Sequence, residues 1–218
     1  MWVKICGIKD LESARLIAGL KPDAVGLNFF AKSSRCVGLE TAEKIAAELS
    51  ENVDCVGLFV NHELSEVQEI SQRCQLEFIQ LHGDERPEFL AELLEFNPKI
   101  NIIKAFRIGE AGFDSVAGYL EECTRLSIRP FACLIDADVP GEYGGTGECV
   151  SWDGLRAAYR PEWPPLILAG GLKPANVGTA IQAVGPWGVD VASGVESSPG
   201  VKELSLVKSF IENAREAD

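Results

Sequence analysis

Side chains that can transfer protons stand at the ends of short apolar runs in this 218-residue sequence. Cys6 closes the run VKIC, His82 follows FIQL, and Asp136 follows ACLI. A thiol, an imidazole and a carboxyl group can each act as a general acid or base, provided that they reach the same substrate. These side chains are therefore candidates for proton transfer, although a cysteine can also be a small apolar filler and an aspartate can cap a loop.

Glycine-rich segments follow the later apolar runs. A single glycine pair after a strand is more typical of a tight turn than of a binding site. Two pairs after successive runs favour a phosphate site, because backbone N–H groups and a helix N-terminus bind phosphate oxygens. The sequence thus predicts phosphate-binding residues at Gly170, Gly171, Ser193 and Gly194, with Gly145, Thr146 and Gly147 closing over the same group.

The residues between these positions form a repeating pattern of apolar runs and amphipathic stretches. Several runs are apolar on consecutive residues, as in strands that are buried on both faces. Strands are predicted at Val3–Cys6, Ala24–Phe29, Cys55–Val60, Phe78–Leu81, Asn101–Ala105, Ala132–Ile135, Leu166–Ala169 and Val189–Ala192.

Amphipathic stretches between these runs predict helices. Asp10 is suited to cap a helix that starts at Leu11, and Pro174 is suited to a first helical position. Eight β–α units in a chain of this length favour an α/β fold, a single (β/α)8 TIM barrel over residues 1–218. The rival is a doubly wound sheet, which has about five or six strands. In a barrel the active site lies at the carboxyl ends of the strands, where the residues named above would gather.

The composition restricts the partners. The formal net charge is −13, from 33 acidic and 20 basic residues, which argues against nucleic acid and anionic membranes as partners. An anionic substrate would then need a local positive potential in its site. No secretory signal pattern opens the sequence, and no apolar stretch approaches the ~18 residues of a membrane span.

The seven cysteines include no CxxC pair, and several lie inside apolar runs. This usage predicts reduced, buried thiols and a cytoplasmic protein. The final residues, 213–218, are expected to fray.

Several longer motifs occur in a fixed order along the chain. They are KICG at 4–7, SSRCV at 33–37, GLFVN at 57–61, QLHGDE at 80–85, LIDAD at 134–138, GGTG at 144–147, LAGGLKPANV at 168–177 and DVASGVESSPGVK at 190–202. Together they resemble the phosphoribosylanthranilate isomerase family along essentially the whole chain. KICG and the LAGGL and SGVESSPG segments are the specific signals, whereas GGTG alone is weak.

The resemblance implies an Amadori rearrangement in tryptophan biosynthesis. An acid protonates the ring oxygen of a phosphoribosyl group that carries an anthranilate amine, and a base then removes the proton at C2′. The resemblance implies Cys6 as the general base, Asp136 as the general acid, and Arg35 as the partner of the anthranilate carboxylate. It implies a phosphorylated small molecule as the partner of a monomer or homodimer, with no metal and no organic cofactor.

Each catalytic role sets a condition on a pKa. The thiol of Cys6 has an ordinary pKa of about 8.5, and a positive neighbour is expected to lower it. Lys4 is a candidate, unless strand alternation points it elsewhere. The pKa of Asp136 must lie well above the ordinary value of about 3.9, through burial or a nearby anion. His82 is expected to orient substrate or pack at the rim, and His62 to be a solvated residue at a helix start.

The sequence departs from the family pattern in three places. Ser34 replaces the usual proline before Arg35, which is expected to loosen the loop that carries this arginine. Lys9 stands where threonine is commoner, and residues 149–151 alter the segment after GGTG. None of these differences removes a proposed catalytic group.

Other barrels remain as alternatives. Indole-glycerol-phosphate synthase would need a catalytic lysine and a longer N-terminal segment. Ribulose-phosphate epimerase would need metal-binding histidines, whereas the sequence has only His62 and His82, without metal-binding spacing. The histidine-pathway isomerase would present an aspartate at position 6. A barrel that only binds phosphate or a partner protein is disfavoured by the joint presence of Cys6, Arg35 and Asp136.

Overall fold

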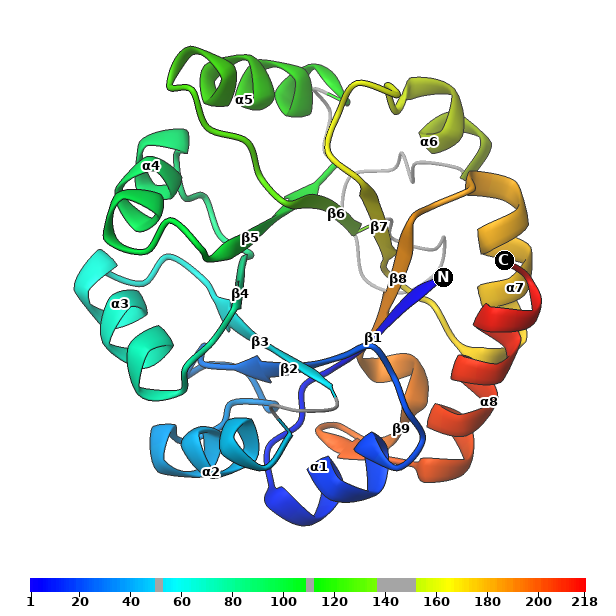
Figure 1. Cartoon of the computed structure of the whole chain (residues 1–218). Helices are drawn as coiled ribbons and strands as arrows, with labels where there is room; N and C mark the ends of the chain where they lie inside the picture. The colour runs from blue at the N-terminus through cyan, green and yellow to red at the C-terminus, as the bar shows by residue number, and fades with distance from the viewer. Residues whose placement is uncertain (50–52, 109–111, 137–151) are drawn as a thin grey trace.

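A closed barrel of parallel strands forms the centre of the molecule (Figure 1). The structure is a computed structural model that describes residues 1–49, 53–108, 112–136 and 152–218. Each strand pairs with its neighbours in sequence, and β8 pairs with β1 to close the barrel. The predicted TIM barrel is confirmed. Its strands are β1 (Trp2–Cys6), β2 (Ala24–Asn28), β3 (Asp54–Phe59), β4 (Phe78–Leu81), β5 (Asn101–Arg107), β6 (Ala132–Asp136), β7 (Leu166–Ala169) and β8 (Gly188–Val191).

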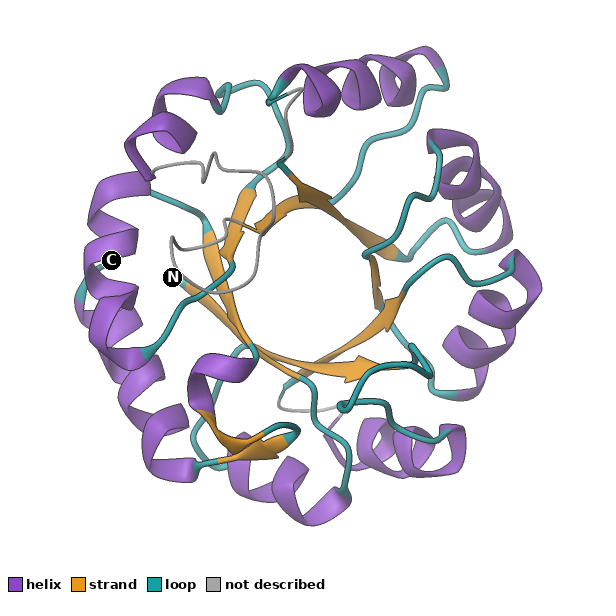
Figure 2. Cartoon of the chain, turned by 180° about the vertical axis from the view of Figure 1, so that it is seen from behind, coloured by secondary structure: helices purple, strands orange, loops and turns teal. Residues whose placement is uncertain are grey.

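Helices surround the barrel on its outer side (Figure 2). The predicted local signals hold: Asp10 Oδ1 accepts a 2.8 Å hydrogen bond from the Ser13 N–H, and Pro174 opens its helix. Among the described residues, no helix is both long enough and apolar enough to span a bilayer. The helices are α1 (Leu11–Ala18), α2 (Leu39–Leu49), α3 (Leu64–Arg73), α4 (Pro87–Phe96), α5 (Asp114–Arg125), α6 (Trp152–Ala158), α7 (Pro174–Val184) and α8 (Leu204–Glu216).

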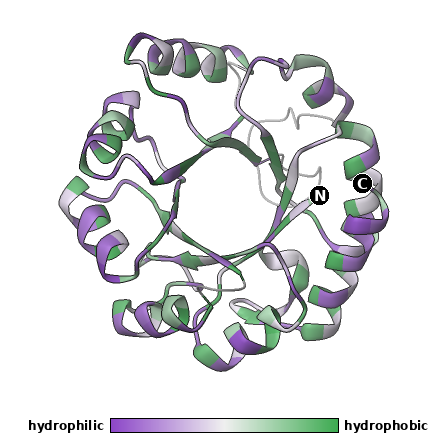
Figure 3. Ribbon diagram, viewed as in Figure 1, coloured by the Kyte–Doolittle hydropathy of each residue, from purple (hydrophilic) through white to green (hydrophobic). Residues whose placement is uncertain are grey.

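The two faces of each strand are buried in different ways. Alternate residues point into the barrel or toward the helices. A small apolar cluster that includes Val56, Ile103 and Leu134 fills the interior, and a larger cluster lies between the strands and the helices. Figure 3 shows the strands as largely hydrophobic and the helices as mixed. Burial on both faces explains why the runs in the sequence are apolar on consecutive residues.

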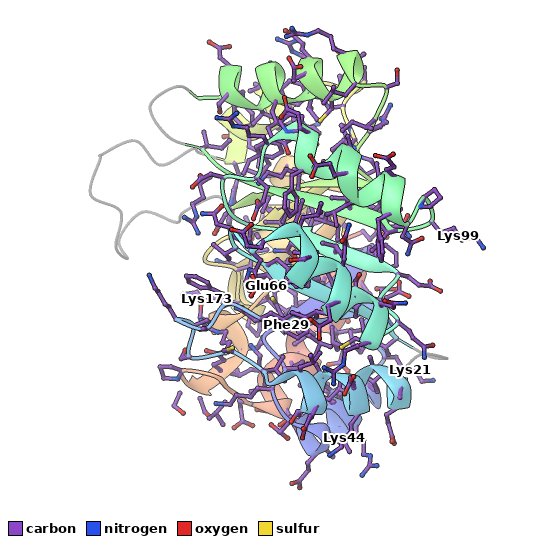
Figure 4. The ribbon with its side chains drawn as sticks, turned by 90° about the vertical axis from the view of Figure 1, so that its left-hand side faces the viewer. Lys21, Phe29, Lys44, Glu66, Lys99 and Lys173 are labelled. Atoms are coloured by element: carbon purple, nitrogen blue, oxygen red, sulfur yellow. The ribbon has the colours of Figure 1, made fainter. Side chains whose placement is uncertain are left out.

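The strands all point the same way, so their carboxyl ends meet at one rim. In the side view of Figure 4, Phe29 and Lys173, which follow β2 and β7, lie toward one end of the barrel. Lys21 and Lys99, which precede β2 and β5, lie toward the other end. Cys6 and Asp136 are the last residues of β1 and β6, and they therefore share the rim of the strands' carboxyl ends.

The predicted fraying of the C-terminus was wrong. Helix α8 continues through Glu216, with Ala214 fully buried, and it packs against α7, α1 and β1. The Asp218 carboxylate also pairs with the Met1 amino group. Contacts made where the barrel closes hold this segment, and such contacts cannot be read from its polar sequence.

A short antiparallel sheet outside the barrel wall was not predicted. After β8, a 3₁₀ helix η1 (Ser193–Val195) leads into β9 (Glu196–Ser198), which pairs with β10 (Val201–Lys202). Gly200 supplies the positive φ of 76° that the connecting turn needs. The two strands lie near α1 and α8 in Figure 1 and Figure 2.

Candidate active site

Cys6 lies at the carboxyl end of β1 and is 5% exposed. Gly26 on the neighbouring strand leaves room for the thiol, because a Cβ at Gly26 would lie 2.6 Å from Cys6 Sγ. Lys4, two residues earlier on the same face, donates a 2.8 Å hydrogen bond to Asp190 Oδ1 and interacts electrostatically with Cys6. Strand alternation therefore points Lys4 toward the thiol, which makes it the positive neighbour that the sequence offered as a candidate.

The thiol has a higher pKa than expected. Burial raises the pKa of Cys6 above its ordinary value, and the Lys4 ammonium, which lowers it, compensates only in part. The positive neighbour therefore acts in the expected direction, but burial outweighs it, so the net shift of the Cys6 pKa is upward. Burial lowers the pKa of Lys4, but the Asp190 carboxylate and Cys6 together raise it by more than burial lowers it. The pKa of Lys4 is therefore above its ordinary value, and Lys4 stays charged. A thiolate at Cys6 is rare at neutral pH, but it forms beside a permanent cation.

Asp136 closes β6 and stands opposite Arg107 in the β5–β6 register. Its side chain is 33% exposed, so the carboxyl group reaches the open mouth of the barrel. The prediction ended β5 at Ala105, whereas the strand continues for two residues and brings Arg107 to the rim. Asp136 therefore faces the mouth of the barrel into which Cys6 points from β1.

His82 connects the barrel interior to Asp136. Its Nδ1 atom lies 2.8 Å from Nε2 of the fully buried Gln80, and its Nε2 atom lies 3.9 Å from Asp136 Oδ2. Because the Gln80 amide nitrogen donates, the ring proton is assigned to Nε2, the atom that faces Asp136. Burial, with help from Arg107, lowers the pKa of His82 to about 4, so the ring is neutral at physiological pH. The geometry suits an orienting group.

A buried ion pair holds the loop that follows His82. Lys104 Nζ lies 3.1 Å from Glu85 Oε2 and donates a 2.7 Å hydrogen bond to the Gly83 carbonyl. Glu85 also accepts a 2.8 Å hydrogen bond from the Asn61 N–H at the end of the neighbouring strand. This pair was not predicted from the sequence, although Glu85 lies within the QLHGDE motif.

Arg35 lies in the loop after β2 and reaches across to β9. Its Nε and Nη2 atoms donate to the two carboxylate oxygens of Glu196, at 2.8 and 2.7 Å. Its stem covers Gly7, where an added Cβ would lie 2.7 Å from Arg35 Cδ. In the same loop, Ser33 Oγ accepts hydrogen bonds from the Arg35 N–H and from Asn28 Nδ2.

The loops after β7 and β8 bring glycine backbone to the same rim. Gly170 and Gly171 have φ angles of 86° and 57°, which favour glycine. A Cβ at Gly194 would lie 1.8 Å from the Leu172 carbonyl oxygen, so the two loops touch through backbone alone. The N–H groups of Gly171 and Gly194 donate to no acceptor in the described part of the chain. They can therefore bind an anion, with Ser193 heading η1 beside them.

Some predicted residues are placed elsewhere or lie outside the described residues. Gly145, Thr146 and Gly147 belong to the undescribed segment 137–151. His62 is partly buried rather than solvated: its Nδ1 accepts a 3.1 Å hydrogen bond from the Val60 N–H, and its ring packs edge-on against Phe59. The expectation for His62 was wrong, because the ring folds back over the end of β3.

The described rim thus combines a deep thiol beside a cation, a more exposed carboxyl group, and backbone donors for an anion. Such a set can protonate a ring oxygen and remove a proton from a neighbouring carbon. The described side chains suit proton transfer on an anionic sugar.

Comparisons with known proteins point to one family. The model of the family described as N-(5'phosphoribosyl)anthranilate (PRA) isomerase matches residues 3–213. The N-(5'-phosphoribosyl)anthranilate isomerase of Geobacter metallireducens is 43% identical over 214 residues, covering 98% of both chains. The protein of the same name from Thermotoga neapolitana is 44% identical over 215 residues, again covering 98% of each chain.

Solved structures agree with these relatives. The phosphoribosyl anthranilate isomerase of Thermotoga maritima superposes with a TM-score of 0.83 at 39% identity, covering 98% of both chains. A phosphoribosyl anthranilate isomerase in complex with reduced 1-(o-carboxyphenylamino)-1-deoxyribulose 5-phosphate gives a TM-score of 0.81 at 37% identity and 98% coverage of each chain. A third structure shows monomers generated from the dimeric Thermotoga maritima enzyme, with a TM-score of 0.81 at 35% identity over 98% of both chains.

Proposed function

The chain belongs to the N-(5'-phosphoribosyl)anthranilate isomerase family, and from this premise we propose that Cys6 and Asp136 carry the proton transfers of its reaction. The enzyme catalyses the Amadori rearrangement of N-(5-phosphoribosyl)anthranilate to 1-(2-carboxyphenylamino)-1-deoxyribulose 5-phosphate in tryptophan biosynthesis. The observation that carries the proposal is the common rim of the two groups at the ends of β1 and β6.

Asp136 acts first, as the general acid. It gives a proton to the ring oxygen while the bond between this oxygen and C1′ breaks, which leaves an iminium ion between C1′ and the anthranilate nitrogen. The neutral ring of His82 supports this step, because its Nε2–H is directed toward the Asp136 carboxyl group from 3.9 Å.

Cys6 acts second, as the general base. Its thiolate takes the proton from C2′, and the electrons of the broken bond form the C1′–C2′ double bond of the enolamine and neutralise the iminium nitrogen. In the tautomerisation of the enolamine, the C2′ hydroxyl loses a proton and C1′ gains one, which yields the aminoketone; Cys6 then releases its proton and Asp136 regains one. The Lys4 ammonium stabilises the thiolate before the substrate binds.

Binding groups fix the two ends of the substrate. Arg35 pairs with the anthranilate carboxylate through its planar guanidinium group. Gly170, Gly171, Ser193 and Gly194 bind the phosphate, supported by the unpaired N–H groups at the β7 and β8 exits among the described residues. With its carboxylate bound at one end and its phosphate at the other, the substrate would have its sugar between Cys6 and Asp136.

The proposal extends to the whole chain. Residues 1–218 act as one catalytic domain that takes a phosphorylated small molecule and works as a monomer or homodimer, which light scattering would distinguish. We place the enzyme in the cytoplasm. The free thiols of Cys6, Cys36, Cys55, Cys74, Cys123 and Cys133 support this location.

Variants of the two catalytic residues test the proposal. Cys6→Ala and Asp136→Asn should each lower kcat by on the order of 10²–10⁴, the usual contribution of one acid or base. Turnover is followed through the loss of anthranilate fluorescence. Affinity for the reduced product analogue, measured by calorimetry, should change much less.

Cys133→Ala is the matched control, because this thiol is equally buried on β6 and points away from the barrel interior. It should keep kcat within about threefold of the unaltered enzyme, apart from any loss of stability. Turnover close to the original in either active-site variant would refute the assignment of that residue.

A further inference from the structure

Glu196 links three separate segments of the rim. Its carboxylate, only 4% exposed, accepts hydrogen bonds from Arg35 Nε at 2.8 Å, from Arg35 Nη2 at 2.7 Å and from Lys202 Nζ at 2.8 Å. Lys202 in turn donates a 2.9 Å hydrogen bond to the Ala192 carbonyl at the end of β8. The first residue of β9 is therefore tied to the loop after β2 and to the start of the phosphate loop.

The pairing uses only one edge of the arginine. A guanidinium group has five N–H bonds, and Glu196 takes the side formed by Nε and Nη2. The opposite fork, formed by Nη1 and the second N–H of Nη2, donates to no acceptor among the described residues and can donate to a second carboxylate in the bidentate geometry that arginine favours. Glu196 thereby determines which edge of Arg35 remains for a ligand.

The stem of Arg35 is fixed relative to the catalytic thiol. Its Cδ lies over Gly7, the residue after Cys6, and only the absence of a side chain there permits this contact. Gly7 has a φ of 87°, which favours glycine. The guanidinium group thus has a fixed stem at one end and a fixed partner at the other, so its free fork has a defined direction from Cys6.

The charges around Glu196 also favour the binding of an anion. Arg35 and Lys202 bring two positive charges to one carboxylate, which leaves a net positive charge in a protein whose formal net charge is −13. Burial raises the pKa of Glu196, but the hydrogen bonds from Arg35 and Lys202 lower it more, to about 2. The carboxylate therefore stays ionised at physiological pH.

We propose that Glu196 is a positioning residue for substrate specificity, which aims the free fork of Arg35 at the ortho-carboxylate of the aryl amine. The inference rests on the proposed pairing of Arg35 with the substrate. Without Glu196, Arg35 turns about its own side-chain bonds, and the carboxylate loses a prearranged partner. The phosphate loop keeps its own anchor, because Lys202 still donates to the Ala192 carbonyl when Glu196 is changed.

Two substrates separate this role from a general structural one. One is N-(5-phosphoribosyl)anthranilate, and the other is the N-phosphoribosyl derivative of aniline, which lacks the carboxylate. Glu196→Gln keeps the shape of the side chain and removes its charge. It should raise KM for the carboxylated substrate by about tenfold to a hundredfold, because a charge-assisted pair is involved, and change kcat by less than about threefold. With the aniline substrate, KM should change by less than about twofold.

The Arg15–Glu48 pair supplies a matched control. It has the same two-point geometry, at 2.9 and 3.1 Å, but it lies exposed on α1 and α2. Glu48→Gln should leave the KM for both substrates unchanged. Glu196→Asp, which keeps the charge but shortens the reach, should give an intermediate KM and serves as the measured variant if Glu196→Gln does not fold.

Arg35→Ala distinguishes the proposed role of Arg35 in binding the carboxylate from the proposed role of Glu196 in positioning Arg35. If Arg35→Ala does not discriminate between the two substrates, the proposed role of Arg35 is wrong. If Arg35→Ala discriminates and Glu196→Gln does not, only the positioning role of Glu196 fails. Equal losses of kcat on both substrates in Glu196→Gln would show a merely structural role and would also overturn the inference.

Discussion

At the scale of single residues, the barrel interior gives Cys6 an unusual environment. The thiol is buried next to Lys4, whose charge is balanced by Asp190 rather than by solvent. Burial disfavours the thiolate and Lys4 favours it, and the first effect is larger. A base with a raised pKa is less often ionised but takes a carbon-bound proton more readily once it is ionised.

The pH profile of kcat/KM should show the raised pKa of Cys6 directly. Because the base must be deprotonated, activity falls as the pH drops below the pKa of Cys6. Since this pKa is raised, kcat/KM should still increase with pH above about 8.5, the ordinary value for a thiol. His82 is neutral down to about pH 4, so no step near pH 6.5 is expected from it. A plateau that begins below pH 7 would contradict the environment described for Cys6.

The sequence predicted the types of the site residues better than their partners. Cys6 and Asp136 end strands and Arg35 lies in the loop after a strand, and these positions in a barrel place them at the rim. Whether Lys4 approaches Cys6 depended on the strand register, and the sequence left it open. The partner of Arg35 is 161 residues away, in a hairpin that no periodicity reveals, so Glu196 was missed.

At the scale of elements, the βα loops carry the binding groups and two of them depend on glycine. The loops after β7 and β8 approach each other so closely that Gly194 has no room for a side chain. The donors that face the phosphate are backbone N–H groups, and side chains hold the loops from behind: Asn176 donates to the Gly171 carbonyl and Lys202 to the Ala192 carbonyl. The phosphate site is thus a property of two connections and not of individual side chains.

A single methyl group should disrupt this contact. In Gly194→Ala, the new Cβ would meet the Leu172 carbonyl oxygen at 1.8 Å, so the loops must separate. We expect KM to rise by about tenfold or more, the loss of one or more hydrogen bonds to phosphate, with a smaller change in kcat. Inorganic phosphate should also become a weaker inhibitor.

Gly118→Ala on α5 is the companion variant, since nothing lies within 4 Å of the added Cβ. It should leave KM unchanged and stabilise the helix by up to about 1 kcal/mol. An unaltered KM in Gly194→Ala would mean that the phosphate does not bind between these loops.

The order of the elements could be predicted, but not all of their ends. The strands buried on both faces give unbroken apolar runs, and the predicted ranges lie within two residues of the observed ones. Strand β5 runs on to the charged residue Arg107, which no apolar pattern indicates. The β9–β10 hairpin was missed because its strands have three and two residues, too few for an alternation to appear.

At the scale of the whole molecule, closure of the barrel solves a problem of charge. The chain as a whole repels anions, yet its substrate carries a phosphate and a carboxylate. Pairing of β8 with β1 brings Lys4, Arg35 and Lys202 together with the carboxylates of Asp190 and Glu196. These five side chains leave one net positive charge at the rim, where low exposure makes it effective over short distances.

The central claim is that one sugar lies between a thiol from the first strand and a carboxyl group from the sixth. A crystal structure of the enzyme with reduced 1-(o-carboxyphenylamino)-1-deoxyribulose 5-phosphate tests it most directly. We predict Cys6 Sγ within about 3.5 Å of C2′, the Asp136 carboxyl group hydrogen-bonded to the oxygen that came from the sugar ring, and the phosphate on the N–H groups of Gly171 and Gly194. A phosphate bound at another part of the barrel, or a C2′ beyond the reach of Cys6, would contradict the account.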